Sequence, residues 1–240
     1  MRPSGIVFDL DGTLILSHHD FGRMRVEIVK TAEGYGVPPG RLAVDELIGT
    51  TQVLDAARRE LMAAGVPEEA ILRFHLEVNR GVDAIEMEAL RRTTTRRGAE
   101  ELLRDLSERA FRLGLFTRSS EGFCQAALTQ TGLRQFFPYT RTRTEPGPAK
   151  PSPEALHLLL EKMDVPVGRA LFVGDHLEDS RCATRAGVTF YGVLPDPDQP
   201  NPTTAEQFLA SGAAAVAANL EDVGRLINGA TTDGRRSRPR

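Results

Sequence analysis

Two aspartates stand two residues apart near the start of this 240-residue sequence, Asp9 and Asp11, directly after an apolar run that ends at Phe8. In an extended chain residues i and i+2 lie on the same side, so both carboxylates are expected at one place beyond the run. Paired carboxylates can divide catalysis: one is a nucleophile or metal ligand, and the other donates and accepts protons. Gly12 allows a sharp turn after them. The pattern predicts a reactive site, with an acidic helix-capping turn as the structural alternative.

A hydroxyl and a lysine follow later in the chain. Thr117 comes directly after the apolar run 112–116. A hydroxyl followed by backbone N–H groups that open a helix suits phosphate oxygens, although a Ser or Thr at such a junction is normally just a helix N-cap. Lys150 precedes a Pro-x-Pro entry into a helix, which fixes where its ammonium points. Near paired carboxylates, such a cation offsets the charge of a nucleophile and of a phosphate dianion, although taken alone Lys150 is better explained as a surface lysine.

Two more aspartates follow another apolar run, Ala170–Val173. Asp175 and Asp179 are four residues apart, so they share a face once a helix begins. Mg²⁺ prefers a few carboxylate oxygens together with water and phosphate oxygens. The spacing therefore predicts a Mg²⁺ site.

These residues need a scaffold that brings strand ends together. Short apolar runs predict buried strands at 6–8, 112–116, 170–173 and 188–193. Helical patterns lie after or between them at 98–109, 122–131, 153–163 and 179–186. Buried strands that alternate with helices are typical of a doubly wound α/β fold, with a parallel sheet covered on both faces.

Residues 16–95 have a different pattern of apolar residues from the rest of the chain. Four helical stretches are expected there, without a convincing strand, at 21–33, 54–64, 68–79 and 83–92. Within this segment His18-His19-Asp20 resembles a metal-ligand run, but Asp20 is better explained as the N-cap of the first helix. A helical block inserted after the first strand predicts an all-helical cap domain, joined by linkers near 14–17 and 93–97.

The predicted division gives a core domain of residues 1–15 and 96–228 and a cap domain of residues 16–95. Residues 229–240 are rich in Gly, Thr and Arg and are expected to form a disordered tail.

Composition narrows the function classes. The formal charge of −3 and the pI near 6.0 give no electrostatic argument for binding nucleic acid. Cys124 and Cys182 lie far apart and predict reduced core residues, not a disulfide or a zinc site. No apolar run approaches 18 residues, and acids interrupt the first run, so neither a membrane span nor a signal peptide is expected. We expect a soluble, cytoplasmic protein.

Taken in order, the Asp9 to Thr13 segment, Thr117, Lys150 and the Gly174 to Asp179 segment resemble the four motifs of the haloacid dehalogenase-like (HAD) hydrolase superfamily. The resemblance spans Ile6 to Val193, and the layout looks like that of the phosphoglycolate-phosphatase-like members, which carry a helical cap. It implies a Rossmann-like core.

The resemblance also implies roles. Asp9 would be the nucleophile and Asp11 the general acid and base. Thr117 and Lys150 would hold the phosphate, and we place the neighbouring Arg118 among the substrate-binding residues.

The resemblance further implies that Mg²⁺ is bound by Asp9, the Asp11 carbonyl and Asp175, with Asp179 supporting the metal site. Gly49 and Thr50 match the place of a substrate-specificity loop in capped relatives, although a plain interhelical turn explains them equally well.

The implied function is Mg²⁺-dependent hydrolysis of a small phosphorylated metabolite, similar to phosphoglycolate or a sugar phosphate, through an aspartyl-phosphate. Asp11 favours phosphoryl transfer over dehalogenation, since dehalogenases of this fold lack a second aspartate. A phosphonatase would need a cap lysine, for which Lys30 is the sole candidate. A sugar-phosphate mutase keeps the same motifs. A non-catalytic binding module remains as the alternative of another class, and monomer and homodimer are both open.

Overall fold

The computed structural model describes residues 3–45, 49–198 and 203–233. The chain divides into two compact units, one of Met1–Ser17 with Arg92–Arg240 and the other of His18–Arg91. These boundaries lie a few residues inside the insert expected from the sequence, residues 16–95. A role for the second unit as a cap stays a prediction.

The first unit contains a six-stranded parallel sheet with the order β5-β4-β1-β6-β7-β8. Its strands are β1 (Gly5–Phe8), β4 (Arg112–Phe116), β5 (Tyr139–Arg141), β6 (Ala170–Gly174), β7 (Thr189–Val193) and β8 (Ala215–Ala217). The four strands predicted from apolar runs are present, and the α/β fold class is confirmed. The sequence patterns missed β5 and β8, because three residues are too few to show a period.

Strand β1 lies at the point where the strand order reverses. Phe8 at its end is in register with Leu115 of β4 on one side and Val173 of β6 on the other. In a parallel sheet the carboxyl ends of neighbouring strands meet at one edge, and ligands bind at such a switch point. The topology thus brings the predicted site segments to the same edge.

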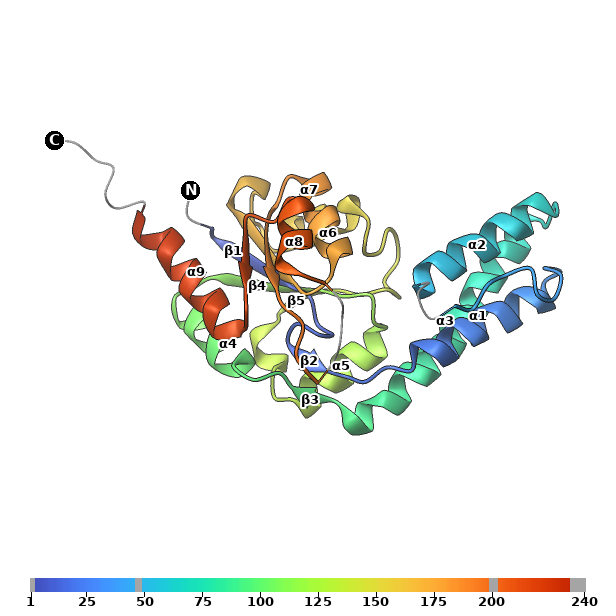
Figure 1. The fold of residues 1–240 in the computed structure, drawn as a ribbon, viewed down its shortest axis with the longest axis horizontal. Coiled ribbons are helices and arrows are strands. Elements are labelled where there is room, and N and C mark those ends of the chain that lie inside the picture. The colour runs from blue at the N-terminus through green and yellow to red at the C-terminus, as the bar shows by residue number, and fades with distance from the viewer. Residues whose placement is uncertain (1–2, 46–48, 199–202, 234–240) are drawn as a thin grey trace. The chain divides into compact units, whose positions relative to one another are not determined.

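Helices cover both faces of the sheet (Figure 1). They are α4 (Ala99–Glu108), α5 (Glu121–Gln130), α6 (Pro153–Lys162), α7 (Leu177–Ala186), α8 (Ala205–Ala210) and α9 (Leu220–Asp233). A row of buried rings, Phe116, Phe172, Phe190 and Phe208, continues from the sheet to α8, with neighbouring centroids 5.6 to 5.9 Å apart. Cys124 and Cys182 are buried and unbridged, as expected.

Helix α9 corrects the expected tail. It continues to Asp233, so residues 229–233 are helical and not disordered. A helix that is already nucleated gains one hydrogen bond for each residue added, and this outweighs a locally unfavourable composition. Residues 234–240 lie outside the described residues.

Both expected linkers form regular structure. Strand β2 (Ile15–Leu16) pairs antiparallel with β3 (Thr94–Thr95), with Ile15 opposite Thr95. The β-branched side chains of this ribbon favour an extended backbone.

The second unit is helical in its described part, with α1 (Phe21–Gly34), α2 (Thr50–Ala63), α3 (Glu68–Ala89) and a 3-10 turn at Leu90–Arg92. Asp20 caps α1 as predicted, since its carboxylate accepts a hydrogen bond from the Arg23 N–H at 2.9 Å. Across the described residues of the whole chain, no helix is long and apolar enough to cross a membrane.

The two helices expected at 68–79 and 83–92 are one helix, α3. Gly81 lies inside it, and glycine costs a helix interior about 0.5–1 kcal/mol relative to alanine. A Cβ at this position would lie 2.6 Å from Glu27 Oε1 of α1, so the glycine permits close packing of two helices. The sequence shows a helix-breaking glycine at position 81, but it does not show the packing against α1 that favours glycine there.

Gly192 offers a test of core packing in the sheet unit. A Cβ on Gly192 would lie 2.7 to 2.9 Å from ring atoms of the fully buried Phe208. Overpacking of this kind costs about 1–3 kcal/mol, so Gly192→Ala should lower the unfolding free energy by that amount in urea melts. Gly168→Ala is the matched control, because a Cβ added there would have no atom within 4 Å. Equal midpoints for the two variants would contradict this packing.

Candidate active site

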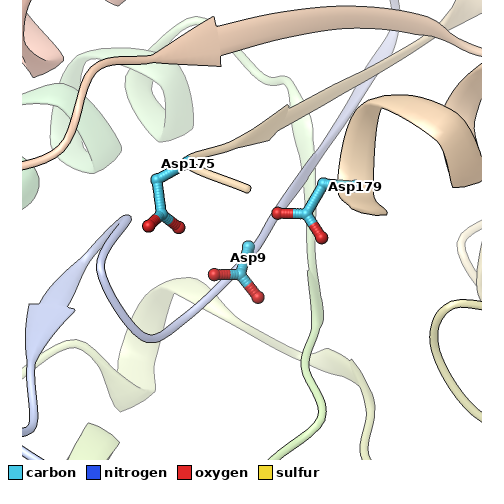
Figure 2. Close-up of side chains that lie close together, drawn as sticks. All are labelled: Asp9, Asp175 and Asp179. Atoms are coloured by element: carbon cyan, nitrogen blue, oxygen red, sulfur yellow. The ribbon is translucent and has the colours of Figure 1, made fainter. Parts of the chain in front are cut away.

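Three buried aspartates meet at the carboxyl edge of the sheet (Figure 2). Asp9 follows β1, Asp175 follows β6, and Asp179 lies in the first turn of α7. One carboxylate oxygen from each lies within 4.8 Å of the others, a spacing that could hold a metal ion. The arrangement brings together three of the residues predicted as metal ligands.

Glycines make this approach possible. Gly12 has a φ of +79°, which favours glycine, and a Cβ there would overlap the Asp175 carboxylate. Gly174 ends β6, and a Cβ on it would overlap the Asp179 carboxylate. The backbone must therefore lack side chains at both places for the aspartates to lie where they do.

Lys150 is the cation of this cluster. Its ammonium pairs with Asp9 Oδ1, with Asp179 Oδ1 at 2.9 Å, and donates to the Phe116 carbonyl at 3.2 Å. The Lys150 side chain is only 4 % exposed, so it is not an ordinary surface lysine.

The charges of the cluster do not balance. Burial raises the pKa of Asp9 well above its ordinary value, and Asp179 and Asp175 act in the same direction, against Lys150. Burial and the charge of Asp179 also raise the pKa of Asp175. Burial by itself would lower the pKa of Lys150, but Asp179 and Asp9 outweigh it and the pKa is raised. The Lys150 ammonium thus pairs with two of the three buried carboxylates, and a divalent cation would supply further positive charge.

Thr13 links two of the aspartates and was not predicted as a site residue. Its buried hydroxyl lies 2.8 Å from Asp175 Oδ1 and 3.3 Å from Asp9 Oδ2. The residue belongs to the Asp-Leu-Asp-Gly-Thr segment, so the sequence contained the signal, but only the fold shows that Asp175 is its partner.

Asp11 takes part in a separate set of contacts. Its carboxylate is not in the group formed by Asp9, Asp175 and Asp179. Instead, Asp11 Oδ2 accepts a hydrogen bond from the Ser119 hydroxyl at 2.6 Å. The Ser119 N–H donates to Thr117 Oγ1 at 3.0 Å. Because Ser119 also bonds Asp11, the loop after β4 is joined to the loop after β1. Ser119 is a second residue that the sequence patterns missed.

A model of the haloacid dehalogenase-like hydrolases matches residues 3–187 of the chain. The chain belongs to this family. The matched region contains both aspartates of the first motif, Lys150 and the Asp175–Asp179 pair.

The curated relatives of this hydrolase include phosphoglycolate phosphatases. The one from Pseudomonas fluorescens is 30% identical over 194 residues, 78% of this chain and 67% of the relative. The one from Pseudomonas putida is 30% identical over 219 residues, 85% of this chain and 74% of the relative. These matches place the chain in the phosphoglycolate-phosphatase-like branch and make it a phosphatase.

A solved structure of a hydrolase from Pseudomonas syringae has the same fold. Its TM-score is 0.67 at 18% sequence identity, and the match covers 95% of this chain and 99% of that one. The likeness supports the HAD architecture of the hydrolase.

Arg118, predicted to bind substrate, forms an ion pair in the hydrolase. Its guanidinium lies 2.6 Å from Glu178 Oε2, and both side chains are about one third exposed. Gly49 and Thr50 belong to the helical unit, where Gly49 is the N-cap of α2. Substrate contacts for these three residues stay predictions.

The charge imbalance predicts how stability depends on pH. Because the folded-state pKa values of Asp9 and Asp175 are raised, the folded protein holds protons more tightly than the unfolded chain. The metal-free hydrolase should therefore lose stability as pH rises from about 4 through those raised values. Asp175→Asn removes one charge and keeps an acceptor for Thr13. It should raise the neutral-pH Tm of the metal-free protein by about 2 °C or more, roughly the shift that 1 kcal/mol produces.

The measurement is thermal unfolding of chelator-treated protein between pH 5 and 8, with and without Mg²⁺. Asp164→Asn is the control, since the Asp164 side chain is 90% exposed. Mg²⁺ should stabilise the parent and the control but not Asp175→Asn. A lower Tm for metal-free Asp175→Asn would contradict the view that burial and repulsion together make the Asp175 charge destabilising.

Proposed function

We propose that this hydrolase is a Mg²⁺-dependent phosphatase that acts on a small phosphomonoester through an aspartyl-phosphate on Asp9. One observation carries the proposal: Asp9 lies buried between the Lys150 ammonium and the Asp175 carboxylate, at the carboxyl edge of the sheet. A nucleophilic carboxylate, a fixed cation and a metal-binding carboxylate are thus held together. The phosphoglycolate phosphatases among its relatives support a substrate of the phosphoglycolate or sugar-phosphate kind.

The donor set fits a divalent metal. Carboxylate oxygens are the ligands that Mg²⁺ prefers, and the pKa values of Asp9 and Asp175 are raised first by burial and then by the neighbouring carboxylates, so a bound cation would stabilise their charged forms. Asp9, Asp175 and the Asp11 carbonyl would hold the ion, and Asp179 would support it. When bound, Mg²⁺ offsets negative charge on the phosphoryl oxygens and the nucleophile.

In the first step a carboxylate oxygen of Asp9 attacks phosphorus, and the bond from phosphorus to the ester oxygen breaks. Asp11 donates a proton to the departing oxygen, so the alcohol product leaves neutral. Lys150 is already fixed by Asp9, Asp179 and the Phe116 carbonyl, so it can stabilise charge on the phosphoryl group without reorganising. The hydroxyl of Thr117 would bind a phosphoryl oxygen.

In the second step water attacks the phosphorus of the aspartyl-phosphate, and the bond to the Asp9 oxygen breaks. The Asp11 carboxylate takes the proton from that water and is again ready to act as the acid. The hydrogen bond from Ser119 holds the Asp11 carboxylate in place for both transfers. Inorganic phosphate and free Asp9 result.

The division of roles between the two aspartates can be tested by substitution. Asp9→Asn should abolish turnover, because the first step has no nucleophile. Asp11→Asn should still react with p-nitrophenyl phosphate, whose leaving group scarcely needs a proton, and then stall before hydrolysis. Mass spectrometry of quenched Asp11→Asn should find one added phosphoryl group that maps to Asp9 and is labile to alkali.

Asp105→Asn is the control for these variants, since Asp105 lies on α4 and pairs with Arg109 at the surface. It should turn over like the parent and carry no adduct. Normal turnover by Asp9→Asn, without an adduct in Asp11→Asn, would mean that water attacks phosphorus directly. Release of phosphate, as opposed to an isomerised sugar phosphate, separates a phosphatase from a mutase.

Substrate choice is proposed to depend on the helical unit through Gly49 and Thr50, at the start of α2. Thr50→Ala should change the order of kcat/KM across phosphoglycolate and sugar phosphates by about tenfold or more, while activity on p-nitrophenyl phosphate changes less. An unchanged order would remove Thr50 from substrate selection. Gln52→Ala serves as the control for the α2 start, since Gln52 accepts a hydrogen bond from the Gly49 N–H at 3.1 Å.

A further inference from the structure

Arg96 is a buried arginine beside the acid cluster, and none of the motifs includes it. It follows β3, and its backbone N–H donates to the Leu14 carbonyl at 2.9 Å. Its side chain is 4 % exposed, whereas the next residue, Arg97, is exposed. A guanidinium stays charged at all ordinary pH values, so its burial requires compensating partners.

Two short hydrogen bonds fix the Arg96 guanidinium. Nη1 donates to the Gly12 carbonyl at 2.6 Å, and Nη2 donates to the Leu194 carbonyl at 2.6 Å. Gly12 lies in the loop after β1, and Leu194 directly follows β7. Strand β6 lies between β1 and β7 in the sheet, and it ends at the residue before Asp175. The guanidinium therefore spans the end of the strand that presents Asp175.

The charge of Arg96 acts on the same cluster. Its Nε lies 3.7 Å from Asp196 Oδ2, beyond hydrogen-bonding distance, while both short bonds go to neutral carbonyls. Burial lowers the pKa of Arg96, and the negative charges of Asp175 and Asp196 act against that shift. Arg96 is thus a second positive charge near the aspartates, in addition to Lys150.

The Gly12 carbonyl belongs to a turn that contacts several aspartates of the site. The peptide that contains it joins Gly12 to Thr13, whose hydroxyl contacts both Asp175 and Asp9. On its other side Gly12 follows Asp11, the proposed acid and base. A Cβ on Gly12 would overlap the Asp175 carboxylate, so the glycine lets the turn lie directly against that side chain. The turn that Arg96 holds thus contains or contacts three of the proposed catalytic or metal-binding carboxylates.

We infer that Arg96 is a positioning residue for phosphoryl transfer, which fixes the Asp11–Thr13 turn against Asp175 by holding the Gly12 carbonyl. The inference rests on the proposed function, because phosphate release is the reaction that Arg96 would affect. In this assignment Arg96 acts through the turn that it holds and not by contact with substrate. Its loss should lower kcat while the apparent affinity for a small phosphomonoester changes little, since misplaced groups act on the transition state more than on binding.

The experiment compares the full chain with Arg96→Ala, Arg96→Lys and Arg97→Ala, using p-nitrophenyl phosphate and Mg²⁺. Arg96→Ala should lower kcat about a hundredfold, the loss expected when catalytic groups are misplaced by about 1 Å, with KM within about threefold of the parent. Arg96→Lys keeps the charge but not the planar fork that reaches two carbonyls, so its kcat should be intermediate. Arg97→Ala should match the parent.

Chemical rescue separates positioning from a purely structural role. About 50 mM guanidinium chloride, well below denaturing concentrations, should raise kcat of Arg96→Ala by about tenfold or more, because the free ion can occupy the vacated space and bond both carbonyls. Urea at the same concentration has a similar shape without the charge, and NaCl matches the ionic strength. Neither should rescue, and guanidinium should not activate Arg97→Ala.

Each result of these experiments either supports or overturns the assignment of Arg96. A kcat for Arg96→Ala within threefold of the parent, or a loss that urea restores equally well, would overturn the assignment. If circular dichroism shows that Arg96→Ala does not fold, Arg96→Lys decides: lower kcat at unchanged KM and Tm supports positioning, and unchanged kcat overturns it. A parent protein without any turnover on phosphomonoesters would instead contradict the proposed function, and the assignment would fall with it.

Discussion

The buried contact between the Lys150 ammonium and the carboxylates of Asp9 and Asp179 is the interaction on which the site depends. A charged group that is removed from water is stable only with partners of opposite charge, and removing one partner leaves the other uncompensated. Because Lys150 has two carboxylate partners, it also holds the end of β1 close to the start of α7. The negative charge that remains among the three aspartates is what makes the cluster suited to a cation. The same buried charges thus hold the site together and make it suited to bind a cation.

Bringing three carboxylates together imposes demands on the backbone. Gly12 and Gly174 leave the space that a Cβ would fill, so the loop after β1 and the end of β6 can approach two carboxylates directly. Thr13 and Ser119 then supply hydroxyl donors to the aspartates from neighbouring loops. These donors come from segments that follow different strands, which is why a parallel sheet with aligned carboxyl ends is needed to assemble them. The repulsion retained in the cluster costs stability, and the packed phenylalanine rings beneath the sheet help to offset that cost.

The family match and the geometry of the structure support different conclusions about this protein. The haloacid dehalogenase-like family and the phosphatase class follow from the match over residues 3–187 and from the curated relatives. Which side chains contact one another follows from the structure alone. Arg96 illustrates the difference: it lies within the matched region, yet its importance is visible only from the carbonyls that it bonds. The Arg118–Glu178 pair is similar, because only the fold shows that Arg118 already has an anionic partner.

Features that depend on neighbours a few residues away in the chain are predictable from local geometry. The two-residue spacing of Asp9 and Asp11, the four-residue spacing of Asp175 and Asp179, the buried strands and the Asp20 cap all follow from strand and helix geometry. The tertiary structure decided the pairings between distant segments: Lys150 meets Asp9 across 141 positions, and Ser119 meets Asp11 across 108. It also decided that Gly81 continues a helix, because the packing of α1 offsets the local preference to break. Local periodicity carries no information on such contacts, since they arise only when the strands have been ordered in the sheet.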